Sequence, residues 1–406
     1  MRILLISNNP LSNTGSNGRT MLNMLGHFKK DEILNFFVSG DNPAFESALF
    51  YRIKDIDVLK NKKPFGSNLI QEDKRVYNTK KSSKESVFKY FIRSLIWSKK
   101  SIKSELLTVA LDFKPDRIVL QCGDSDFLIN ISVWLSYKIG IPLISYNSED
   151  YIFKSWNYIE KKNHLSLFFK IFMKRLRKSY DSLYKKGKSF IYLTDSLKDL
   201  YLSKYPNHNA LVIYNSSNLN QVTNYNKNGD IVYCGNVGVG RHKSLIDLSD
   251  HLYKKFNKKI KIYSQITDDS ILNALKNCKT LNYVGNVSYS ECVAIQKNSS
   301  FLIFVESFDE YYLKDTRNAF STKIADSLML GIPVIALLPE SSFAFKYLSE
   351  NECAIVASSL DTLNRQISLL DENKLHSIVF NAINTAEKNH NGQLNSNKFY
   401  EIICGE

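Results

Sequence analysis

The sequence predicts an α/β protein made of two parallel-sheet domains, and three observations support this prediction. Short apolar runs alternate with longer amphipathic stretches over most of the 406 residues, as strands alternate with helices in a parallel sheet. The alternation stops at a polar stretch over 215–229 that is rich in Asn and Ser, and then resumes. Hydrophobic residues make up 44% and charged residues 23%, which suits a globular core. We therefore expect two domains joined by a linker.

The first domain is expected to begin with a buried strand over Ile3–Ile6. A loop rich in Gly, Asn and Ser leads from it into a helix predicted over Arg19–Phe28, and another helix is predicted over Ile129–Tyr137. The segment 40–83 is polar and weakly patterned, which indicates a loop-rich insertion. Apolar runs bounded by turn residues predict the remaining strands of this domain at Ile33–Val38, Arg117–Gln121, Pro142–Tyr146, Phe190–Leu193 and Val212–Tyr214.

The second domain repeats this alternation from Asp230 onward. Its helices are expected to begin at Ser244, Asp269 and Ser290, and a long final helix is predicted between Leu363 and Tyr400. Ligands of such folds bind at the carboxyl ends of the strands, so the residues that follow each strand are the candidates for a site. The expected strands are Ile231–Tyr233, Ile260–Tyr263, Leu281–Val284, Phe301–Val305, Pro333–Leu338 and Cys353–Val356.

The best-defined unit of the second domain reads NAFSTKIADSLMLGIPVIA over 318–336. Ser321 or Thr322 can cap a helix there, because a hydroxyl oxygen accepts an otherwise unpaired backbone N–H. Gly331 suits the left-handed residue after the helix, and the proline that follows prevents continuation. Lys323 beside the free amides of a helix start makes an anion site. The spacing alone fits any βα unit of a doubly wound sheet equally well.

This segment resembles the donor-nucleotide motif of group-1 (family 4-like) glycosyltransferases with the GT-B fold, in which two Rossmann-like domains face each other across a cleft. The resemblance implies that Asp326, at the place of the family's second Glu, holds the donor ribose hydroxyls. It also implies that Ser321, Thr322 and Lys323 lie under the donor diphosphate. Asn318 stands where the family has its first Glu; its amide can hydrogen-bond a sugar hydroxyl but carries no charge.

Two glycine-containing turns are further candidates for donor binding. After the first strand, Gly15 and Gly18 lie in a turn whose backbone amides can approach a phosphate or a sugar, although a simple βα turn would look the same. The turn resembles the family's N-terminal glycine loop in its place along the chain. Gly285 follows a strand of the second domain, in the loop where the family's nucleotide base stacks.

The strand Ile231–Tyr233 leads into a cationic glycine turn. Gly235, Asn236, Arg241 and Lys243 belong to this turn, and a guanidinium and an ammonium can neutralise a diphosphate leaving group. The family has a Gly-Arg pair and a later Lys here, so the match is partial. The alternative is a flexible cationic turn without a ligand.

Carboxylates follow two strands of the first domain and are the candidates for a base. Asp124, Glu149 and Asp150 could take a proton from an acceptor hydroxyl, or they could simply lie at helix starts as caps. The sequence contains no HEXXH, GXSXG or Walker A pattern, which argues against a zinc protease, a serine hydrolase and a P-loop enzyme.

The net charge of +14 calls for an anionic partner. Basic residues concentrate in Lys84–Lys103 and Lys161–Lys188, and aromatic residues are interleaved with them. Such segments suit an anionic membrane surface, an ordinary solvated helix face, or nucleic acid. We prefer the membrane, because no nucleic-acid motif accompanies the charge, and we expect no nucleic-acid partner. The aromatics proposed for shallow insertion are Trp97, Phe168, Phe169 and Phe172.

The sequence also indicates the cellular compartment of the protein. The six cysteines show neither Cys-x-x-Cys nor zinc spacing, which indicates reduced thiols. The start, MRILLISNNP, is too short and too polar for a signal peptide, and no apolar run reaches the roughly 18 residues that a membrane span needs. We expect a cytoplasmic protein, peripheral on the inner face of the cell membrane.

Together these features and the resemblance imply a metal-independent glycosyltransferase without a cofactor. It would move a sugar from a nucleotide-sugar, a UDP- or GDP-sugar, to a hydroxyl of a glycan or lipid-linked glycan in bacterial surface polysaccharide synthesis. The expected domains are an acceptor-side domain over 1–218, a donor-binding domain over 229–385, and a helix over 386–406 that returns to the first. The alternatives are a non-catalytic GT-B-like protein that binds membrane or a partner, and a sugar-nucleotide epimerase of the same fold.

Overall fold

A computed structural model describes residues 1–13, 16–39, 42–59, 86–161 and 166–405. The chain divides into two compact units, one formed by Met1–Tyr214 with Asn395–Glu406 and the other by Asn215–Leu394. Each unit is an α/β layer structure with one parallel sheet, so the predicted fold class is confirmed. All six cysteines are free.

The sheet of the first unit has seven parallel strands in the order β3-β2-β1-β4-β5-β6-β7. The central strands are buried along their length, because helices cover both faces. The carboxyl ends of β4 and β5 are neighbours, which places the residues after them at one edge of the sheet. The strands are β1 Ile3–Ser7, β2 Ile33–Phe37, β3 Leu49–Arg52, β4 Arg117–Gln121, β5 Leu143–Asn147, β6 Ser189–Tyr192 and β7 Ala210–Val212.

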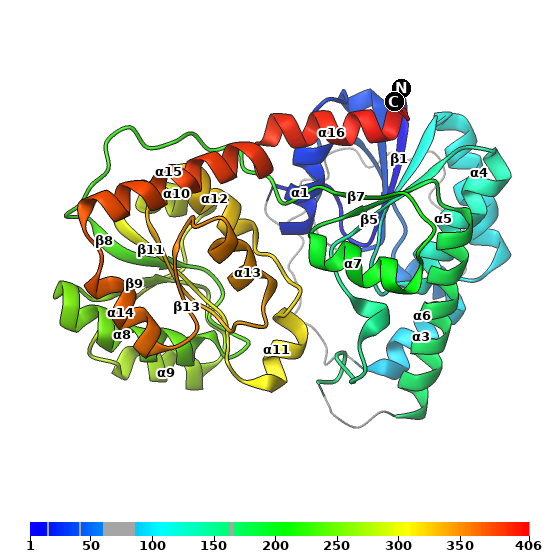
Figure 1. The fold of residues 1–406 in the computed structure, drawn as a ribbon. Helices are drawn as coiled ribbons and strands as arrows, with labels where there is room; N and C mark the ends of the chain where they lie inside the picture. The colour runs from blue at the N-terminus through cyan, green and yellow to red at the C-terminus, as the bar shows by residue number, and fades with distance from the viewer. Residues whose placement is uncertain (14–15, 40–41, 60–85, 162–165, 406) are drawn as a thin grey trace. The chain divides into compact units, whose positions relative to one another are not determined.

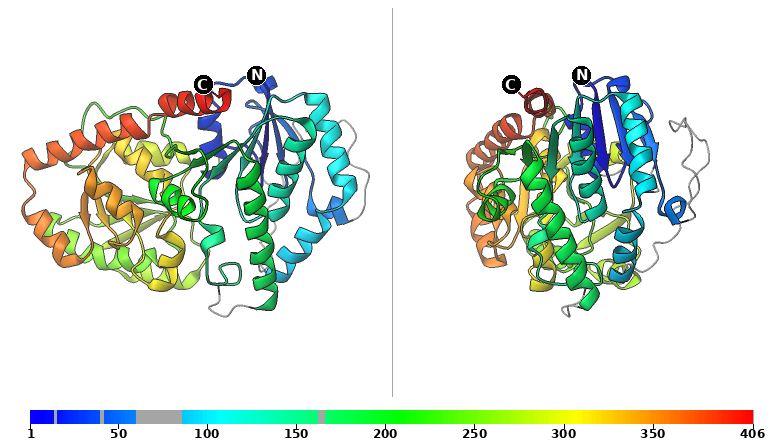
Figure 2. Two further views of the ribbon diagram at one scale, coloured as in Figure 1. Left: turned by 45° about the vertical axis from the view of Figure 1, so that its right-hand side comes forward. Right: turned by 90° about the vertical axis from the view of Figure 1, so that its right-hand side faces the viewer.

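Helices cover this sheet on both sides. α4 (Lys100–Phe113), α5 (Asp126–Ile139) and α6 (Leu167–Lys186) stand side by side on one face (Figure 2). α1 (Ser16–Met24) lies on the other, where it meets α16 (Gly392–Cys404) through a hydrogen bond from Ser396 to the Met24 carbonyl (Figure 1). The remaining helices are α2 Asp55–Leu59, α3 Val87–Ile96 and α7 Asp195–Lys204.

Three expectations for the first unit were wrong. The segment 40–83 is not loop throughout, because β3 and α2 form within it and Phe50 is buried against β2; residues 60–83 lie outside the described part of the chain. The first helix begins and ends earlier than Arg19–Phe28, since the chain turns at Leu25. β7 ends at Val212, where the expected strand began. β3 is an edge strand of only four residues, LFYR, inside an otherwise polar segment, so its apolar run is short.

The second unit carries six parallel strands in the order β10-β9-β8-β11-β12-β13. Leu245, Leu248 and Leu252 place one face of α8 on this sheet, where they form the core with β8 and β9. The strands are β8 Asp230–Cys234, β9 Ile260–Tyr263, β10 Leu281–Gly285, β11 Ser299–Val305, β12 Val334–Leu337 and β13 Ile355–Ala357. The helices are α8 Arg241–Phe256, α9 Asp269–Asn277, α10 Tyr289–Lys297, α11 Glu310–Thr316, α12 Thr322–Leu330, α13 Phe343–Glu350, α14 Leu360–Ser368 and α15 Glu372–Asn389.

The long helix expected between Leu363 and Tyr400 is instead three helices, α14, α15 and α16. Asp371 separates α14 from α15, because its carboxylate accepts the Lys374 N–H at 2.7 Å and so caps the start of α15. His390 ends α15 as a buried residue whose ring bonds to the Asn215 carbonyl at 2.7 Å. Burial lowers the pKa of His390 to about 4, so the ring is neutral at physiological pH.

The polar stretch 215–229 packs on the second unit. The Asn215 amide donates to the Phe320 carbonyl at 2.8 Å, and the Tyr225 hydroxyl donates to the Ser300 carbonyl at 2.8 Å. The Val222 N–H reaches the Leu330 carbonyl at the end of α12. These bonds fix the stretch beside the helix that carries the best-defined sequence motif.

Candidate functional site

The start and end of α12 are as the sequence predicts. Ser321 is the N-cap, and its hydroxyl accepts the Lys323 N–H at 3.3 Å; Thr322 is the first helical residue. Gly331 takes the left-handed conformation with φ 68° and ends the helix. Ile324 and Leu328 are buried. The helix therefore begins at the carboxyl end of the sheet, with Lys323 in its first turn.

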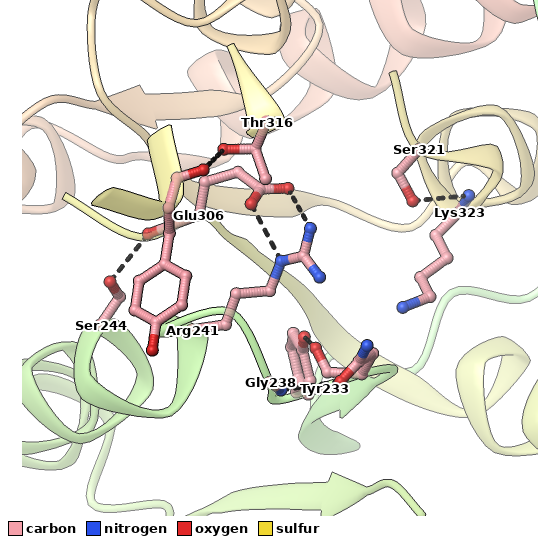
Figure 3. A network of polar contacts seen from close by, with 10 residues as sticks. Tyr233, Gly238, Arg241, Ser244, Glu306, Thr316, Ser321 and Lys323 are labelled. Atoms are coloured by element: carbon pink, nitrogen blue, oxygen red, sulfur yellow. Dashed lines mark hydrogen bonds and ion pairs between the residues drawn. The ribbon is translucent and has the colours of Figure 1, made fainter. Parts of the chain in front are cut away.

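The Lys323 side chain lies over the turn after β8. A Cβ added to Gly235 would overlap the Lys323 Nζ, so the ammonium occupies the space that the glycine leaves open. The Nζ also lies 5.9 Å from the centre of the Tyr233 ring. Burial, and after it the charge of Arg241, lower the pKa of Lys323 to about 8. Figure 3 shows the ammonium pointing back from α12 toward Arg241.

Arg241 begins α8 directly after Gly240, whose φ of 78° turns the chain sharply. Its guanidinium donates twice to Glu306, from Nε to Oε2 at 2.9 Å and from Nη2 to Oε1 at 2.8 Å (Figure 3). The side chains are only 18% and 7% exposed, so the pair is largely withdrawn from water. Arg241, Ser321 and Lys323 line one small cavity of about 40 Å³. The structure thus brings the predicted cations to one cavity and pairs Arg241 with a carboxylate.

Asp326 lies one turn into α12 and is 6% exposed. Its carboxylate accepts the Ser217 hydroxyl at 2.7 Å and the Tyr289 hydroxyl at 3.1 Å. Two hydroxyl donors on one carboxylate are the pattern that a ribose diol would also offer. Sequence reasoning missed Ser217 and Tyr289, because their partner Asp326 is distant in sequence. Glu306 follows a strand directly, and that place in the sequence predicts a residue that faces the cleft or caps a loop.

The other predicted donor residues of the second unit take varied places. The Asn236 side chain accepts the Gly238 N–H at 2.7 Å and so braces the turn. Lys243 is exposed on the first turn of α8. Gly285 ends β10 with φ 127°, which only glycine adopts readily, and Asn318 lies half-buried in the turn between α11 and α12.

The first unit holds its candidate acids at neighbouring strand ends. Asp124 follows β4 and accepts the Tyr158 hydroxyl at 3.4 Å. Asp150 follows β5, forms an ion pair with Lys154 at 3.7 Å, and makes no capping hydrogen bond. The backbone carbonyl of Glu149 accepts the Tyr201 hydroxyl at 3.0 Å. Burial raises the pKa of Tyr151 strongly, and all three of these carboxylates raise it further, which places them around one ring.

The glycine turn after β1 is closely packed. A Cβ on Gly18 would come within 2.7 Å of the Pro10 carbonyl oxygen and the Ser12 nitrogen, so backbone segments meet there without room for a side chain. Gly15 lies outside the described residues.

The aromatic set proposed for membrane insertion needs correction. Trp97 is fully buried, donates its indole N–H to Asp55 at 2.7 Å and stacks on Phe127. Phe169 and Phe172 are each 2% exposed, because they form the inner face of α6. Phe168 is exposed. The exposed apolar side chains of α3 and α6, called here the α3–α6 surface, are Phe88, Leu95, Leu167, Phe168 and Ile171.

Among the described residues, no helix is long and apolar enough to cross a membrane. Within the same ranges, no group of His, Cys, Asp and Glu side chains forms a candidate metal site.

Neither a family model nor a curated protein sequence matches this chain. Solved structures do match. Anabaena Alr3699/HepE in complex with UDP aligns over 100% of both chains with a TM-score of 0.65 at 10% identity. TarM aligns over 99% of this chain and 98% of its own with a TM-score of 0.62 at 12% identity, and a TarM from S. aureus is also known with UDP bound. WaaG, a glycosyltransferase of lipopolysaccharide biosynthesis, aligns over 100% of both chains with a TM-score of 0.58 at 12% identity. These likenesses establish the GT-B fold.

Proposed function

We propose that this protein is a glycosyltransferase of the group-1 type, which takes a nucleotide-sugar as donor and a hydroxyl of a glycan or lipid-linked glycan as acceptor. One observation above all supports it: two cations, Lys323 and Arg241, line one cavity together with the N-cap of α12, and the Asp326 carboxylate lies one turn further along the same helix. A nucleoside diphosphate needs such a pairing, cations for its phosphates and an acceptor for its ribose hydroxyls. HepE, of the same fold, is known in complex with UDP and with UDP-glucose.

In this proposal the second unit stabilises the leaving group. As the bond from the anomeric carbon to the phosphate oxygen breaks, negative charge grows on the diphosphate. The Lys323 ammonium, the Arg241 guanidinium and the α12 amides are fixed before the reaction and therefore stabilise that charge without reorganising. The bound ribose would replace the Ser217 and Tyr289 hydroxyls on Asp326. Gly235 lets the ammonium lie against the turn backbone.

The acceptor hydroxyl must lose a proton during the transfer. We propose that a carboxylate of the first unit accepts this proton. The candidates are Asp124, Glu149 and Asp150, which follow neighbouring strands. A carboxylate within hydrogen-bond reach of the hydroxyl can act as the base.

The test is thermal stabilisation by a panel of UDP- and GDP-sugars. A donor at about 100 times its dissociation constant should stabilise the protein by about 2.7 kcal/mol, or about 5–10 °C for a domain of this size. Lys323→Ala should reduce the shift strongly. Lys346→Ala is the matched control, because that exposed lysine of α13 pairs only loosely with Glu350, at 3.9 Å.

The outcomes separate the proposal from its alternatives. Stabilisation by no nucleotide-sugar would overturn the donor assignment. Stabilisation with release of free sugar in the absence of any acceptor would indicate an epimerase. Stabilisation without turnover on any glycan would indicate a binding protein that has lost catalysis.

We further propose that the α3–α6 surface brings the enzyme, on the cytoplasmic side, to an anionic membrane that holds a lipid-linked acceptor. The rings of Phe88 and Phe168 pack at 5.4 Å and are about half exposed, so they form one apolar patch. Lys89, Lys170, Lys174 and Lys178 are exposed on the same two helices. Each cation near an anionic surface contributes about 1 kcal/mol to the free energy of membrane binding, and the aromatic side chains can insert shallowly into the membrane.

Vesicle flotation tests the membrane proposal. Recovery with anionic vesicles should exceed recovery with neutral ones and should fall with salt, because exposed charges are screened over about 10 Å at 0.1 M. The double change Phe88→Ser and Phe168→Ser should reduce recovery, whereas Phe380→Ser, a still more exposed aromatic of α15, should not. Equal recovery on both lipids would favour a soluble acceptor.

A further inference from the structure

Glu306 places a buried negative charge against Arg241, which lines the pocket proposed to bind an anion. It follows β11 directly and is 5% exposed. Its backbone is anchored independently of its carboxylate, since its N–H donates to the Leu337 carbonyl and its own carbonyl accepts the Ser244 hydroxyl at 2.8 Å. The carboxylate is therefore not needed to hold this turn in place.

The ion pair with Glu306 holds the Arg241 guanidinium in one orientation. The Nε and Nη2 atoms both bond the carboxylate, which leaves Nη1 outside the pair and fixes the plane of the guanidinium. A bidentate pair holds an arginine more rigidly than a single bond does. The same pair places a negative charge against Arg241, beside the cavity that Arg241 and Lys323 both line.

We infer that Glu306 is a positioning residue of the proposed diphosphate site, which fixes the Arg241 guanidinium and compensates its charge so that a second cation, Lys323, can remain protonated beside it. This inference rests on the proposed function, because the benefit is a pocket that keeps two cations ready for a diphosphate. Without Glu306, two like charges would share a small and poorly hydrated space, and the lysine is the one able to release its proton.

The groups around Lys323 include charges of both signs. Burial and Arg241 lower the pKa of Lys323, and Glu306 raises it. Cys292 of α10 and Cys234 of β8 also face the ammonium, and the Tyr233 ring lies below it. A hydrogen bond with Cys292, followed by burial, raises the pKa of Cys234, so this thiol is neutral. Glu306 is thus the fixed negative charge among these groups.

Competitive amine labelling of Lys323 with acetic anhydride, followed by peptide mass spectrometry across pH, tests the inference without a donor. The labelling midpoint of the wild type should lie near pH 8. Glu306→Gln should lower it by about one unit or more, which raises labelling about threefold at pH 7.5. Glu306→Asp, which keeps the charge, should restore it toward the wild type. Glu350→Gln is the matched control, with Lys346 as the internal reference.

A second measurement compares Arg241→Gln with the double variant that carries both Arg241→Gln and Glu306→Gln. Neither protein contains an unpaired Arg241, so the measurement does not depend on whether the fold tolerates one. Arg241→Gln alone should raise the midpoint, and the double variant should return it toward the wild type. A midpoint unchanged by Glu306→Gln in folded protein, or identical midpoints for Arg241→Gln and the double variant, would overturn the inference.

Failure of the proposed function would look different. A UDP- or GDP-sugar should protect Lys323 of the wild type from labelling. Absence of protection by every nucleotide-sugar, with the midpoint shift intact, would refute the donor site while leaving the charge balance standing.

Discussion

Gly235→Ala is a sharp test of where the Lys323 ammonium lies. The new Cβ would overlap the Lys323 Nζ and would come within 2.9 Å of Cε and 3.3 Å of Cδ, all at the flexible end of that side chain. Gly235 does not have a positive φ, so its backbone conformation also suits alanine. The lysine, rather than the backbone, must therefore move.

The expected magnitudes follow from that geometry. Stability should change by less than about 1 kcal/mol, because alanine also restricts the unfolded chain. Donor affinity should fall by the value of a hydrogen bond to a charged group, about 1.5–3 kcal/mol, which is roughly 10- to 150-fold in Kd. Isothermal titration with the native nucleotide-sugar measures the affinity, and thermal unfolding measures the stability.

Gly123→Ala is the matched control, since a Cβ there meets no atom within 4 Å and the glycine also follows a strand. It should leave both quantities unchanged. An unaltered Kd in Gly235→Ala, together with a weakened Kd in Lys323→Ala, would refute the placement of the ammonium over the β8 turn. Loss of the folded state in Gly235→Ala would refute the reasoning that the lysine yields.

Three further outcomes are expected. Arg241→Ala should lower kcat by about a hundredfold or more if the guanidinium stabilises leaving-group charge, and near-normal turnover with the native donor would contradict that role. Asp326→Asn should weaken binding of the bare nucleoside diphosphate by a few kcal/mol at most while the fold survives; unchanged affinity would reduce Asp326 to a helix residue bonded to Ser217. Wild-type affinity for a nucleotide-sugar should be steady at lower pH and should fall as pH rises through about 8, because the pKa of Lys323 lies there and only the ammonium attracts phosphate; a flat profile to pH 9.5 would argue against it.

Each of these measurements has a control in the same unit. Arg317→Ala removes an exposed arginine whose partner Glu310 lies 3.8 Å away, so its turnover should be normal. Asp361→Asn changes an exposed carboxylate at the start of α14 and should bind nucleotide as the wild type does. For the pH profile, Lys323→Ala should lose the fall near pH 8.

The sequence by itself determined the elements whose signals are local. Apolar runs of strand length gave β1, β4 and β9 at or near their observed bounds, and the Ser321 cap and Gly331 end gave α12. These signals are local because capping, helical periodicity and turn residues act over a few neighbouring positions. The same reasoning placed the cationic turn after β8 beside the start of α12, since parallel strand ends meet at one edge.

Only the tertiary structure decided which side chains meet. Arg241 and Glu306 stand 65 positions apart and come together because β8 pairs with β11. Trp97 and Phe168 look alike in an aromatic, basic segment, yet one is buried against α5 and the other is exposed, because helix packing selects the inward face. Asp371 divided a continuous helical pattern through one capping bond. Periodicity predicts which face of a helix or strand is buried. The residue that a buried side chain contacts depends on packing between segments that are distant in the chain.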